Sequence, residues 1–347
     1  MSWMDVYKSR LADIDDAVKP VKSGDTVVPS HACGEPKPLM EALLRRAGEL
    51  RNVEIWTGLN HSSGAYCAPE VADSFHINTT FPHTNTRKSI WENRGMMTPI
   101  PFYLFPKAFY DKKLRVDVSL SQVSTPDANG YVSFGISVDM SRAAVEMAPY
   151  SVAYVNPNMP RTCGDTLIHI SAFDAIVEGD EPILEIPKIL DTDPIIERIG
   201  QNIANLIEDG DCLQMGQGKM PNAILKFLVG KKDLGIHTEV FSDNLLPLIE
   251  KGVITGAKKT LVPRKIVACF IQGSKELYKY VHQNMMLQMM PVSFTNDPVN
   301  ICQMDNMVSI NSALEIDLMG QVAAESQGPR QYSGVGGQLD FFRGAAA

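Results

Sequence analysis

The chain alternates short apolar runs with stretches whose apolar residues recur at helical spacing, and glycine-containing loops separate the two. In the first half, the apolar runs predict strands over residues 26–28, 53–56, 117–124 and 151–156, and the helical spacing predicts helices over 38–50 and 140–148. A repeated order of strand, loop and helix is typical of an α/β protein with a largely parallel sheet.

The second half shows the same rhythm. Strands are predicted over 211–216, 234–239 and 265–273, and each leads into a predicted helix, over 221–228, 244–252 and 274–284. Residues 307–326 then alternate apolar and polar positions, which predicts a β-meander.

The two halves meet in a proline-punctuated segment, residues 181–194. Asp193 suits a helix N-cap and Pro194 suits the first turn of the helix that follows. The buried stripe of that helix is predicted from its spacing at Ile195, Ile199, Ile203, Leu206 and Ile207. A chain of 347 residues is long enough for two cores, so we predict two domains, residues 1–187 and 188–347.

Composition narrows the range of partners. The net charge of -8 argues against a nucleic-acid partner, which would need a basic face. The six cysteines are dispersed and form no C-x-x-C pair, which is typical of reduced thiols in a cytosolic protein. The N-terminus lacks the apolar segment of a signal peptide, and no apolar run has the length of a membrane span. We therefore expect a cytoplasmic protein without a membrane partner.

Three features of the second half could carry chemistry. Gly216 and Gly218 lie between a predicted strand and a helix start, where bare N–H groups can bind a phosphate or an oxyanion. Glu239 ends a predicted parallel strand, at the edge where open α/β sheets hold ligands. Gly336 and Gly337 belong to SGVGGQ, whose glycine density suggests close approach of a ligand. Each feature also has a purely structural explanation: a turn, a solvated glutamate and a glycine-rich turn.

Other chemistry finds less support in the sequence. The seven histidines show no metal-ligand spacing, so no metal site is expected. His237 precedes Glu239 by two residues on the predicted strand, so the two side chains share a face. A structural histidine is nevertheless the expected role. There is no G-x-S-x-G nucleophile elbow and no Walker lysine loop.

Nine ordered segments together resemble the acetyl-CoA hydrolase/transferase family, in particular its 4-hydroxybutyrate CoA-transferase branch. The segments are VKSGDTVV, TPDANGYVSFG, YVNPNMPRTCGDT, LIEDGDCLQMGQGKMPNA, LGIHTEVFSD, FIQGSKELY, FTNDP, SINSALEIDLMGQV and SGVGGQLDFFRGA. The resemblance runs through nearly the whole chain, and GIHTE together with SGVGGQ-x-DF-x-RGA is specific to this family.

The resemblance implies roles for individual residues. Glu239 matches the catalytic glutamate, and Asn296 matches an asparagine beside the thioester that forms on it. The residues expected to contact CoA are Gly216, Gln217, Gly218, Lys219, Met220, Gly336 and Gly337. The loop around Cys33 and Gly34 is expected to contribute to the acyl pocket.

The resemblance also implies an architecture and an activity. We expect two tandem α/β domains of the CoA-transferase type, each an open parallel sheet, with the site in the cleft between them. Relatives continue beyond FFRGA, so the second domain is expected to be incomplete. The expected activity moves CoA between a short-chain acyl-CoA, such as 4-hydroxybutyryl-CoA or butyryl-CoA, and acetate, through a glutamyl-CoA thioester. CoA is then a substrate rather than a tightly bound cofactor, and a homo-oligomer is expected.

Two other functions remain open from the sequence. The same nucleophile in a wetter cleft would give an acyl-CoA hydrolase, because water would intercept the activated acyl group. A sensor that binds CoA esters on the same fold, without catalysis, would have no need of the Glu239 carboxylate.

Overall fold

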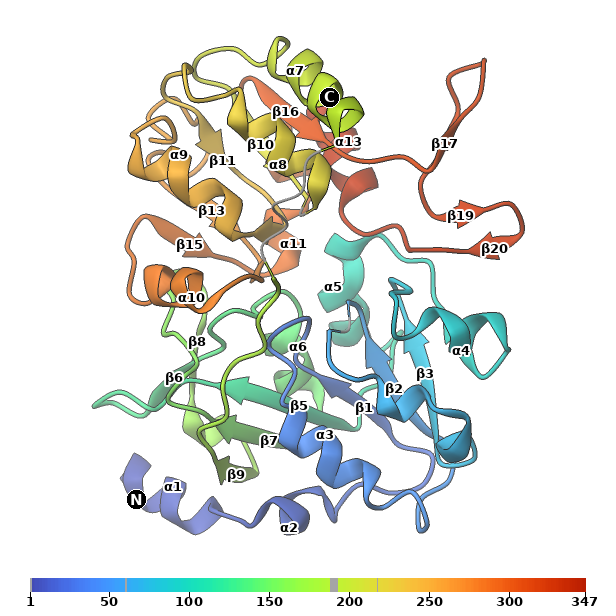
Figure 1. Cartoon of the computed structure of the whole chain (residues 1–347). Coiled ribbons are helices and arrows are strands. Elements are labelled where there is room, and N and C mark those ends of the chain that lie inside the picture. The colour runs from blue at the N-terminus through green and yellow to red at the C-terminus, as the bar shows by residue number, and fades with distance from the viewer. Residues whose placement is uncertain (1, 60, 188–192, 217) are drawn as a thin grey trace.

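The computed structural model describes residues 2–59, 61–187, 193–216 and 218–347. The chain forms two α/β parts stacked one above the other, with the N-terminus in the lower part and the C-terminus in the upper (Figure 1). The lower part contains every element up to β9 (Ala175–Glu178), and the upper part begins with α7 (Pro194–Ala204). The predicted domain boundary falls on residues 188–192, which lie outside the described residues.

The lower part is built on a seven-stranded sheet in which every pair is parallel, in the order β4-β3-β2-β1-β5-β7-β9. Its remaining strands are β1 (Thr26–Pro29), β2 (Val53–Thr57), β3 (Phe75–Thr79), β4 (Gly95–Met97), β5 (Val118–Val123) and β7 (Tyr150–Val155). β1 and β5 are buried at every position, as expected for a sheet covered on both faces. The α/β fold with parallel sheets that the sequence predicts is confirmed.

Six helices and a small antiparallel ladder surround this sheet. The helices are α1 (Trp3–Arg10), α2 (Ile14–Val18), α3 (Lys37–Leu44), α4 (Arg87–Trp91), α5 (Phe105–Tyr110) and α6 (Ser141–Met147). Short 3₁₀ turns are η1 (Ala65–Cys67), η2 (Pro69–Val71), η3 (Phe102–Leu104) and η4 (Ile170–Ala172). The ladder pairs β6 (Tyr131–Ser133) with β8 (Leu167–His169). The strand order reverses between β1 and β5, and ligands of open α/β sheets bind beyond the carboxyl ends of the strands near such a point.

The upper part consists of shorter parallel pairs. β10 (Cys212–Met215) lies between β11 (Gly235–Ile236) and β16 (Met307–Ile310), while β13 (Ile266–Ala268) pairs with β15 (Leu287–Met289). β12 (Val240–Phe241) pairs with β14 (Phe270–Ile271). The strand predicted over 265–273 is therefore interrupted at Cys269, and the strand predicted over 234–239 already ends at Ile236. The continuous apolar run over 266–271 does not reveal its break, because both fragments remain buried.

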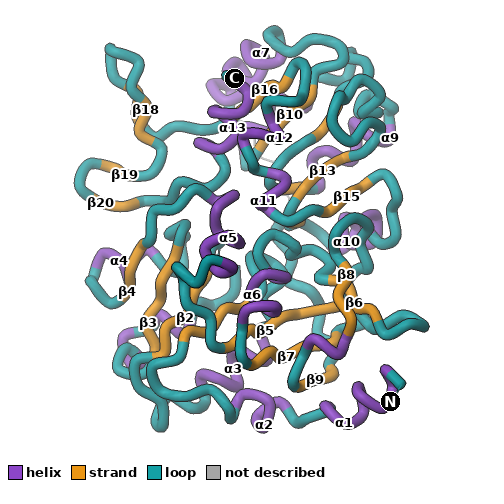
Figure 2. The backbone as a smooth tube through the Cα atoms, turned by 180° about the vertical axis from the view of Figure 1, so that it is seen from behind, coloured by secondary structure: helices purple, strands orange, loops and turns teal. Residues whose placement is uncertain are grey.

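The helices of the upper part are also short. They are α7, α8 (Lys219–Lys226), α9 (Leu246–Glu250), α10 (Lys275–Val281), α11 (Val292–Thr295), α12 (Pro298–Ile301) and α13 (Gln338–Ala345), with the 3₁₀ turn η5 (Asp243–Leu245) before α9. α11 lies against α5 of the lower part, between the two bodies seen from behind (Figure 2).

The predicted stripe of α7 is only partly buried. The Asp193 side chain caps the helix by accepting from the Ile195 N–H, as predicted. However, Ile195 is 69% exposed and Leu206 is 79% exposed. A Cβ on Gly200 would lie 2.9 Å from the Ala223 backbone, so α7 approaches α8 through its small residues. The predicted stripe was therefore wrong at Ile195 and Leu206, whereas Ile203 packs against the core and Ile207 is buried.

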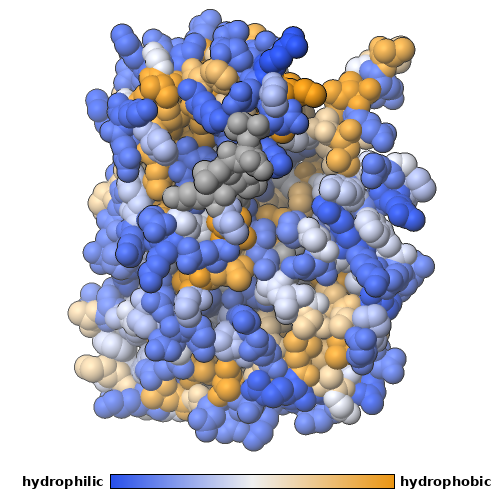
Figure 3. Space-filling model, viewed as in Figure 1, coloured by the Kyte–Doolittle hydropathy of each residue, from blue (hydrophilic) through white to orange (hydrophobic). Residues whose placement is uncertain are grey.

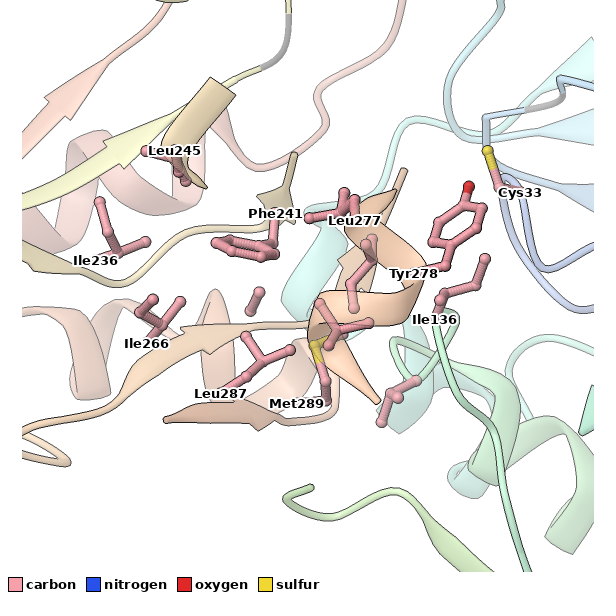
Figure 4. Close-up of a cluster of buried hydrophobic side chains, with 14 of the residues drawn as sticks. Cys33, Ile136, Ile236, Phe241, Leu245, Ile266, Leu277, Tyr278, Leu287 and Met289 are labelled. Carbon is pink, nitrogen blue, oxygen red and sulfur yellow. The ribbon is translucent and has the colours of Figure 1, made fainter. Parts of the chain in front are cut away.

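A hydrophobic cluster joins the two parts. Cys33 and Ile136 of the lower part belong to the same cluster of buried side chains as Tyr278 and Leu277 on α10 (Figure 4). The backbone also crosses between the parts, because Asp165 donates to the Met289 carbonyl over 2.8 Å. The two sheets are therefore held together by shared packing and by strand-like pairing.

Two antiparallel hairpins leave the upper part before α13. They are β17–β18 (Glu315–Ile316 with Val322–Ala323) and β19–β20 (Ser326–Gln327 with Arg330–Gln331). The predicted meander over 307–326 is only half right, since β16 joins the parallel sheet instead. The arm formed by β17–β18 projects from the body with apolar side chains at its end, where Leu318 is 105% and Met319 86% exposed (Figure 3). Among the described residues, no helix is long and apolar enough to cross a membrane.

Gly164 provides a test of the pairing between the two parts. Its φ is +111°, and a Cβ there would lie 2.2 Å from the Met289 carbonyl oxygen. We predict that Gly164→Ala lowers the free energy of unfolding by about 3 kcal/mol, through strain and through separation of residue 164 from β15. Urea unfolding measures this, with Gly230→Ala as the control because a Cβ at Gly230 meets nothing within 4 Å. Equal midpoints for the two variants would contradict the prediction.

Candidate active site

Glu239 lies in the break between β11 and β12. Its carbonyl oxygen accepts from two successive N–H groups, those of Cys269 at 3.0 Å and Phe270 at 3.2 Å. Two donors on one acceptor interrupt the regular ladder, and such irregularities often redirect a side chain next to a functional site. The Glu239 side chain lines a cavity of about 490 Å³ between the two parts.

Asn296 holds the Glu239 carboxylate. Its Nδ2 donates to Glu239 Oε2 over 2.7 Å. Asn296 follows α11, where its backbone N–H donates to Val292, and its side chain is completely buried. The structure therefore brings together the two residues that the resemblance marks as catalytic, although they are 57 positions apart in the sequence.

Gly337 closes the other side of the carboxylate. A Cβ at this position would lie 2.1 Å from Glu239 Oε2 and 2.5 Å from Asn296 Nδ2. Its φ of -90° is accessible to any residue, so space rather than backbone conformation requires glycine here. At Gly336, in contrast, φ is +51° and a Cβ would lie 3.0 Å from the Phe81 ring. The SGVGGQ segment thus approaches both the carboxylate and the lower part.

Both parts of the chain form the cavity wall. The lower part contributes Leu59 and Phe81, which follow β2 and β3, and the upper part contributes Phe270, Gly336 and Gly337. The site consequently lies at the carboxyl ends of parallel strands, where an α/β fold is expected to hold its ligand.

The glycine loop after β10 only partly faces this cavity. Gly216 and Gly218 are on the wall, and a Cβ on either would meet nothing within 4 Å. Gln217 lies outside the described residues. Lys219 is exposed, and Met220 is half-buried against the core, so neither is among the described residues that line the cavity. The CoA contacts assigned to this loop from the sequence stay predictions.

Burial dominates the electrostatics of Glu239. Loss of hydration raises its pKa to about 7, and the nearby Asp139 acts in the same direction. The hydrogen bond from Asn296 and the proximity of His31 oppose this rise. Near neutral pH, Glu239 therefore exchanges between the acid and a carboxylate that is more basic, and so a better nucleophile, than an ordinary glutamate.

His31 and Asp139 form a buried pair close to Glu239. His31 Nδ1 lies 2.9 Å from Asp139 Oδ2, and His31 Nε2 accepts from the Leu59 N–H over 2.8 Å. Because Nε2 accepts from Leu59, it is Nδ1 that carries a proton and donates it to Asp139. The HACGEP loop contributes to the site through His31. Cys33 is buried and faces Tyr278 instead of the cavity (Figure 4).

His237 has the structural role expected for it. Its Nε2 donates to the Thr295 carbonyl over 2.7 Å, and its ring lies edge-on to Phe341. Burial lowers its pKa to about 3, so the ring is neutral. By fixing Thr295, His237 supports the segment that ends in Asn296.

The sequence analysis missed several polar residues of the cavity. His61 Nε2 donates to Gln272 Oε1 over 2.7 Å, and the His83 ring lies 5.0 Å from that of His61. Arg87 stacks on Tyr332, which follows β20. No sequence signal groups these residues, because they come from separate loops. Within the described ranges, no three His, Cys, Asp or Glu side chains are grouped in a way that could hold a metal ion.

Comparison with protein families finds the same family in both parts of the chain. Residues 2–187 match the acetyl-CoA hydrolase/transferase N-terminal domain, and residues 273–347 match the acetyl-CoA hydrolase/transferase C-terminal domain.

Known proteins resemble the whole chain. The 4-hydroxybutyrate coenzyme A transferase of Clostridium kluyveri is 45% identical over 99% of this chain and 80% of its own length. The crystal structure of 4-hydroxybutyrate CoA-transferase from Porphyromonas gingivalis is 41% identical, with a TM-score of 0.85, over 99% of this chain and 80% of that one. RipA from Yersinia pestis is 33% identical, with a TM-score of 0.92, over 100% of this chain and 80% of that one.

The buried charge of Glu239 makes a prediction about stability. Its folded pKa of about 7 exceeds the ordinary 4.5, so the native state disfavours the carboxylate form. The resulting loss of stability should grow as pH rises from about 4.5 to about 7 and then stay constant. We predict that Glu239→Gln is more stable than wild type by about 3 kcal/mol at pH 8 and equal to it at pH 4.

Thermal or urea unfolding at both pH values measures the difference. The control is Glu70→Gln, which changes an exposed side chain and should show no such dependence. A Glu239→Gln variant that is no more stable than wild type at pH 8 would contradict the cost of burial.

Proposed function

The chain belongs to the acetyl-CoA hydrolase/transferase family, and we propose that it transfers CoA between a short-chain acyl-CoA and acetate through a covalent thioester on Glu239. Transfer of CoA is the activity named for the similar proteins of Clostridium kluyveri and Porphyromonas gingivalis. The glutamyl intermediate and the acyl group are the parts that this proposal adds.

One observation carries the proposal: a carboxylate of raised pKa is held by a single amide donor at the wall of a cavity. Glu239 accepts from Asn296 and is pressed against the backbone of Gly337. A glutamate that served only packing or solvation would need neither an opening to a cavity nor a glycine whose missing Cβ makes room for its oxygen. Perturbed carboxyls in clefts are candidates for catalysis.

The reaction consists of two half-reactions, and each of them passes through a mixed anhydride. A Glu239 oxygen attacks the acyl-CoA carbonyl and the C–S bond breaks, which gives a mixed anhydride and CoA thiolate. The thiolate then attacks the Glu239 carbonyl carbon, which forms the enzyme thioester and releases the first carboxylate. Acetate attacks the thioester, and the freed thiolate attacks the acetyl carbonyl of the new anhydride, which yields acetyl-CoA and the original Glu239 carboxylate. No net proton is taken up, and no group other than CoA is transferred.

Asn296 has a second task in this sequence. Its Nδ2 already donates to Glu239 Oε2, and that oxygen becomes an oxyanion whenever thiolate or acetate attacks the glutamyl carbon. A preorganised donor at a developing oxyanion typically stabilises the transition state by about 3 kcal/mol. Asn296 is therefore assigned both to orienting the nucleophile and to stabilising the intermediate.

The cavity suits a short acyl chain with a polar end. Leu59, Phe81 and Phe270 offer apolar contact, while His61 and Gln272 offer polar atoms at the same wall. A 4-hydroxyl group would find hydrogen-bond partners there, which supports 4-hydroxybutyryl-CoA as donor and leaves butyryl-CoA as a substrate of lower affinity. Gly216 and Gly218 provide open backbone for CoA itself, which acts as substrate rather than resident cofactor.

Steady-state kinetics test the proposal. We predict that acyl-CoA consumption with varied acetate gives parallel double-reciprocal lines, because the CoA-enzyme must form before acetate reacts. Glu239→Ala should lose roughly 10⁴-fold or more in kcat while it still unfolds cooperatively as a folded protein. Glu239→Asp should be nearly as inactive, because the shortened side chain misplaces the attacking oxygen. Glu70→Ala, on an exposed side chain, is the control for expression and assay.

The same assay identifies the alternatives. Acyl-CoA loss that does not depend on acetate would indicate a hydrolase, and binding without turnover would indicate a sensor. Intersecting lines would contradict the covalent route, as would an active Glu239→Ala variant.

Gly337 gives an independent prediction. Because an added Cβ would lie 2.1 Å from Glu239 Oε2, Gly337→Ala should push the carboxylate off the Asn296 donor. We predict a loss of about 100-fold in kcat/KM with a change of only a few degrees in Tm, since φ at this residue already suits alanine. Gly48→Ala, where a Cβ meets nothing within 4 Å, is the matched control. Unchanged kinetics in Gly337→Ala would show that the close approach has no catalytic consequence.

A further inference from the structure

A pair of carboxamides lies at the carboxyl ends of β10 and β16, which are neighbours in the upper part (Figure 1). Gln214 Nε2 donates to Asn311 Oδ1 over 3.3 Å, and Asn311 Nδ2 donates back to Gln214 Oε1 over 2.9 Å. Gln214 is only 4% exposed, and both residues line the same cavity as Glu239. The wall of this cavity therefore includes uncharged amide groups as well as the Glu239 carboxylate.

The hydrogen bonds of the pair occupy one of its two edges. Ser309 Oγ donates to Gln214 Oε1 over 2.7 Å and accepts from Asn311 Nδ2 over 2.9 Å, which closes this edge. A carboxamide has two N–H donors and an oxygen with two lone pairs. Both lone pairs of Gln214 Oε1 and both N–H groups of Asn311 are thus used. One Gln214 N–H and one lone pair of Asn311 Oδ1 keep no partner within the described ranges, and these two atoms form the second edge.

The second edge faces the cavity. Ser309, on the opposite edge, is not among the described residues that line the cavity, whereas Gln214 and Asn311 both are. Ala313 and Leu314 follow Asn311 along the chain and line the same wall with apolar side chains. A neutral donor beside a neutral acceptor suits a neutral amide, since a phosphate or carboxylate would meet the Asn311 oxygen as a second acceptor.

Packing of the sheet does not require this arrangement. β10 and β16 are already joined by parallel backbone pairing at four positions, from Cys212 with Met307 to Met215 with Ile310. A carboxamide pair that served only the sheet would have no need of an edge on the cavity. The pair is therefore better explained by a ligand that offers both a carbonyl oxygen and an N–H group.

We propose that Gln214 and Asn311 bind the pantetheine arm of CoA through this edge, with the Gln214 N–H donating to an amide carbonyl and Asn311 Oδ1 accepting from an amide N–H. The arm carries two secondary amides between the sulfur and the phosphates, so the carbonyl of one and the N–H of the other can face the same edge. The proposal rests on the function proposed above and names the part of the substrate that this wall recognises. Because every acyl-CoA carries the same arm, the pair selects for CoA and is indifferent to the acyl group.

Competition by the two halves of CoA tests the assignment. S-methylpantetheine carries the arm without phosphates or a reactive thiol, and 3′-phosphoadenosine diphosphate carries the phosphates without the arm. Gln214→Met keeps the length of the side chain and removes both polar atoms, so the Ki of S-methylpantetheine against acyl-CoA should rise about 10-fold. The Ki of 3′-phosphoadenosine diphosphate should stay within about twofold of wild type. Asn311→Ala should give the same pattern, and it keeps the test decisive if Gln214→Met does not fold.

Steady-state kinetics supply a readout that a merely structural role would not produce. In Gln214→Met, kcat/KM for acyl-CoA should fall about 10-fold, and most of the loss should lie in KM, because the arm binds alike in the ground state and in the transition state. The matched control is Gln201→Met. Gln201 donates to Asn205 Oδ1 over 3.0 Å in an exposed amide pair on α7, so its removal should leave both inhibition constants and KM unchanged.

Three outcomes would overturn the inference. S-methylpantetheine could fail to compete with acyl-CoA in wild type, or its Ki could stay at the wild-type value in both folded variants. An equal rise in the Ki of both halves of CoA would show a general distortion of the cavity instead. None of these results affects the proposed function, which fails only if wild type forms no covalent CoA adduct on Glu239.

Discussion

The site depends on the close approach of three chain segments to one carboxylate. Glu239 comes from a break between two strands, Asn296 from the end of α11 and Gly337 from the start of α13. A Cβ at Gly337 would lie within 2.5 Å of Asn296 Nδ2 and still closer to Glu239 Oε2, so the three positions are fixed relative to one another. The raised pKa of Glu239 follows from this packing, because the same neighbours that hold the carboxylate also exclude water from it.

The rest of the fold positions the three segments that meet at Glu239. The lower sheet directs the loops after β2 and β3 toward the cavity, and β15 anchors the second half against Gly164 and Asp165. A reaction through an anhydride requires a dry site, and Glu239 is itself buried, which raises its pKa. Asn296 and His31 offset part of the cost of burying the Glu239 charge, whereas the nearby Asp139 adds to that cost.

Strand and helix types were predictable from the sequence because their apolar periods are clear, and Glu239 was recognisable from the GIHTE motif. The break between β13 and β14 was not predictable, since residues 266–271 form one apolar run. Ile195 was misassigned because spacing does not show that α7 packs through Gly200. Asp340 lies in the SGVGGQLDF segment, but nothing in that sequence shows that it is completely buried. His61 contacts Gln272 only through tertiary folding. Distant pairs of this kind depend on contacts that no local pattern encodes.

The central claim is that CoA becomes covalently attached to Glu239. Wild-type protein incubated with acyl-CoA in the absence of acceptor, then treated with borohydride and digested, tests this directly by mass spectrometry. We predict that the peptide containing GIHTEVFSD then carries a glutamate side chain reduced to an alcohol. The same peptide from protein treated without acyl-CoA should be unmodified. A modification on any other residue, or an unmodified peptide from protein that transfers CoA normally, would contradict it.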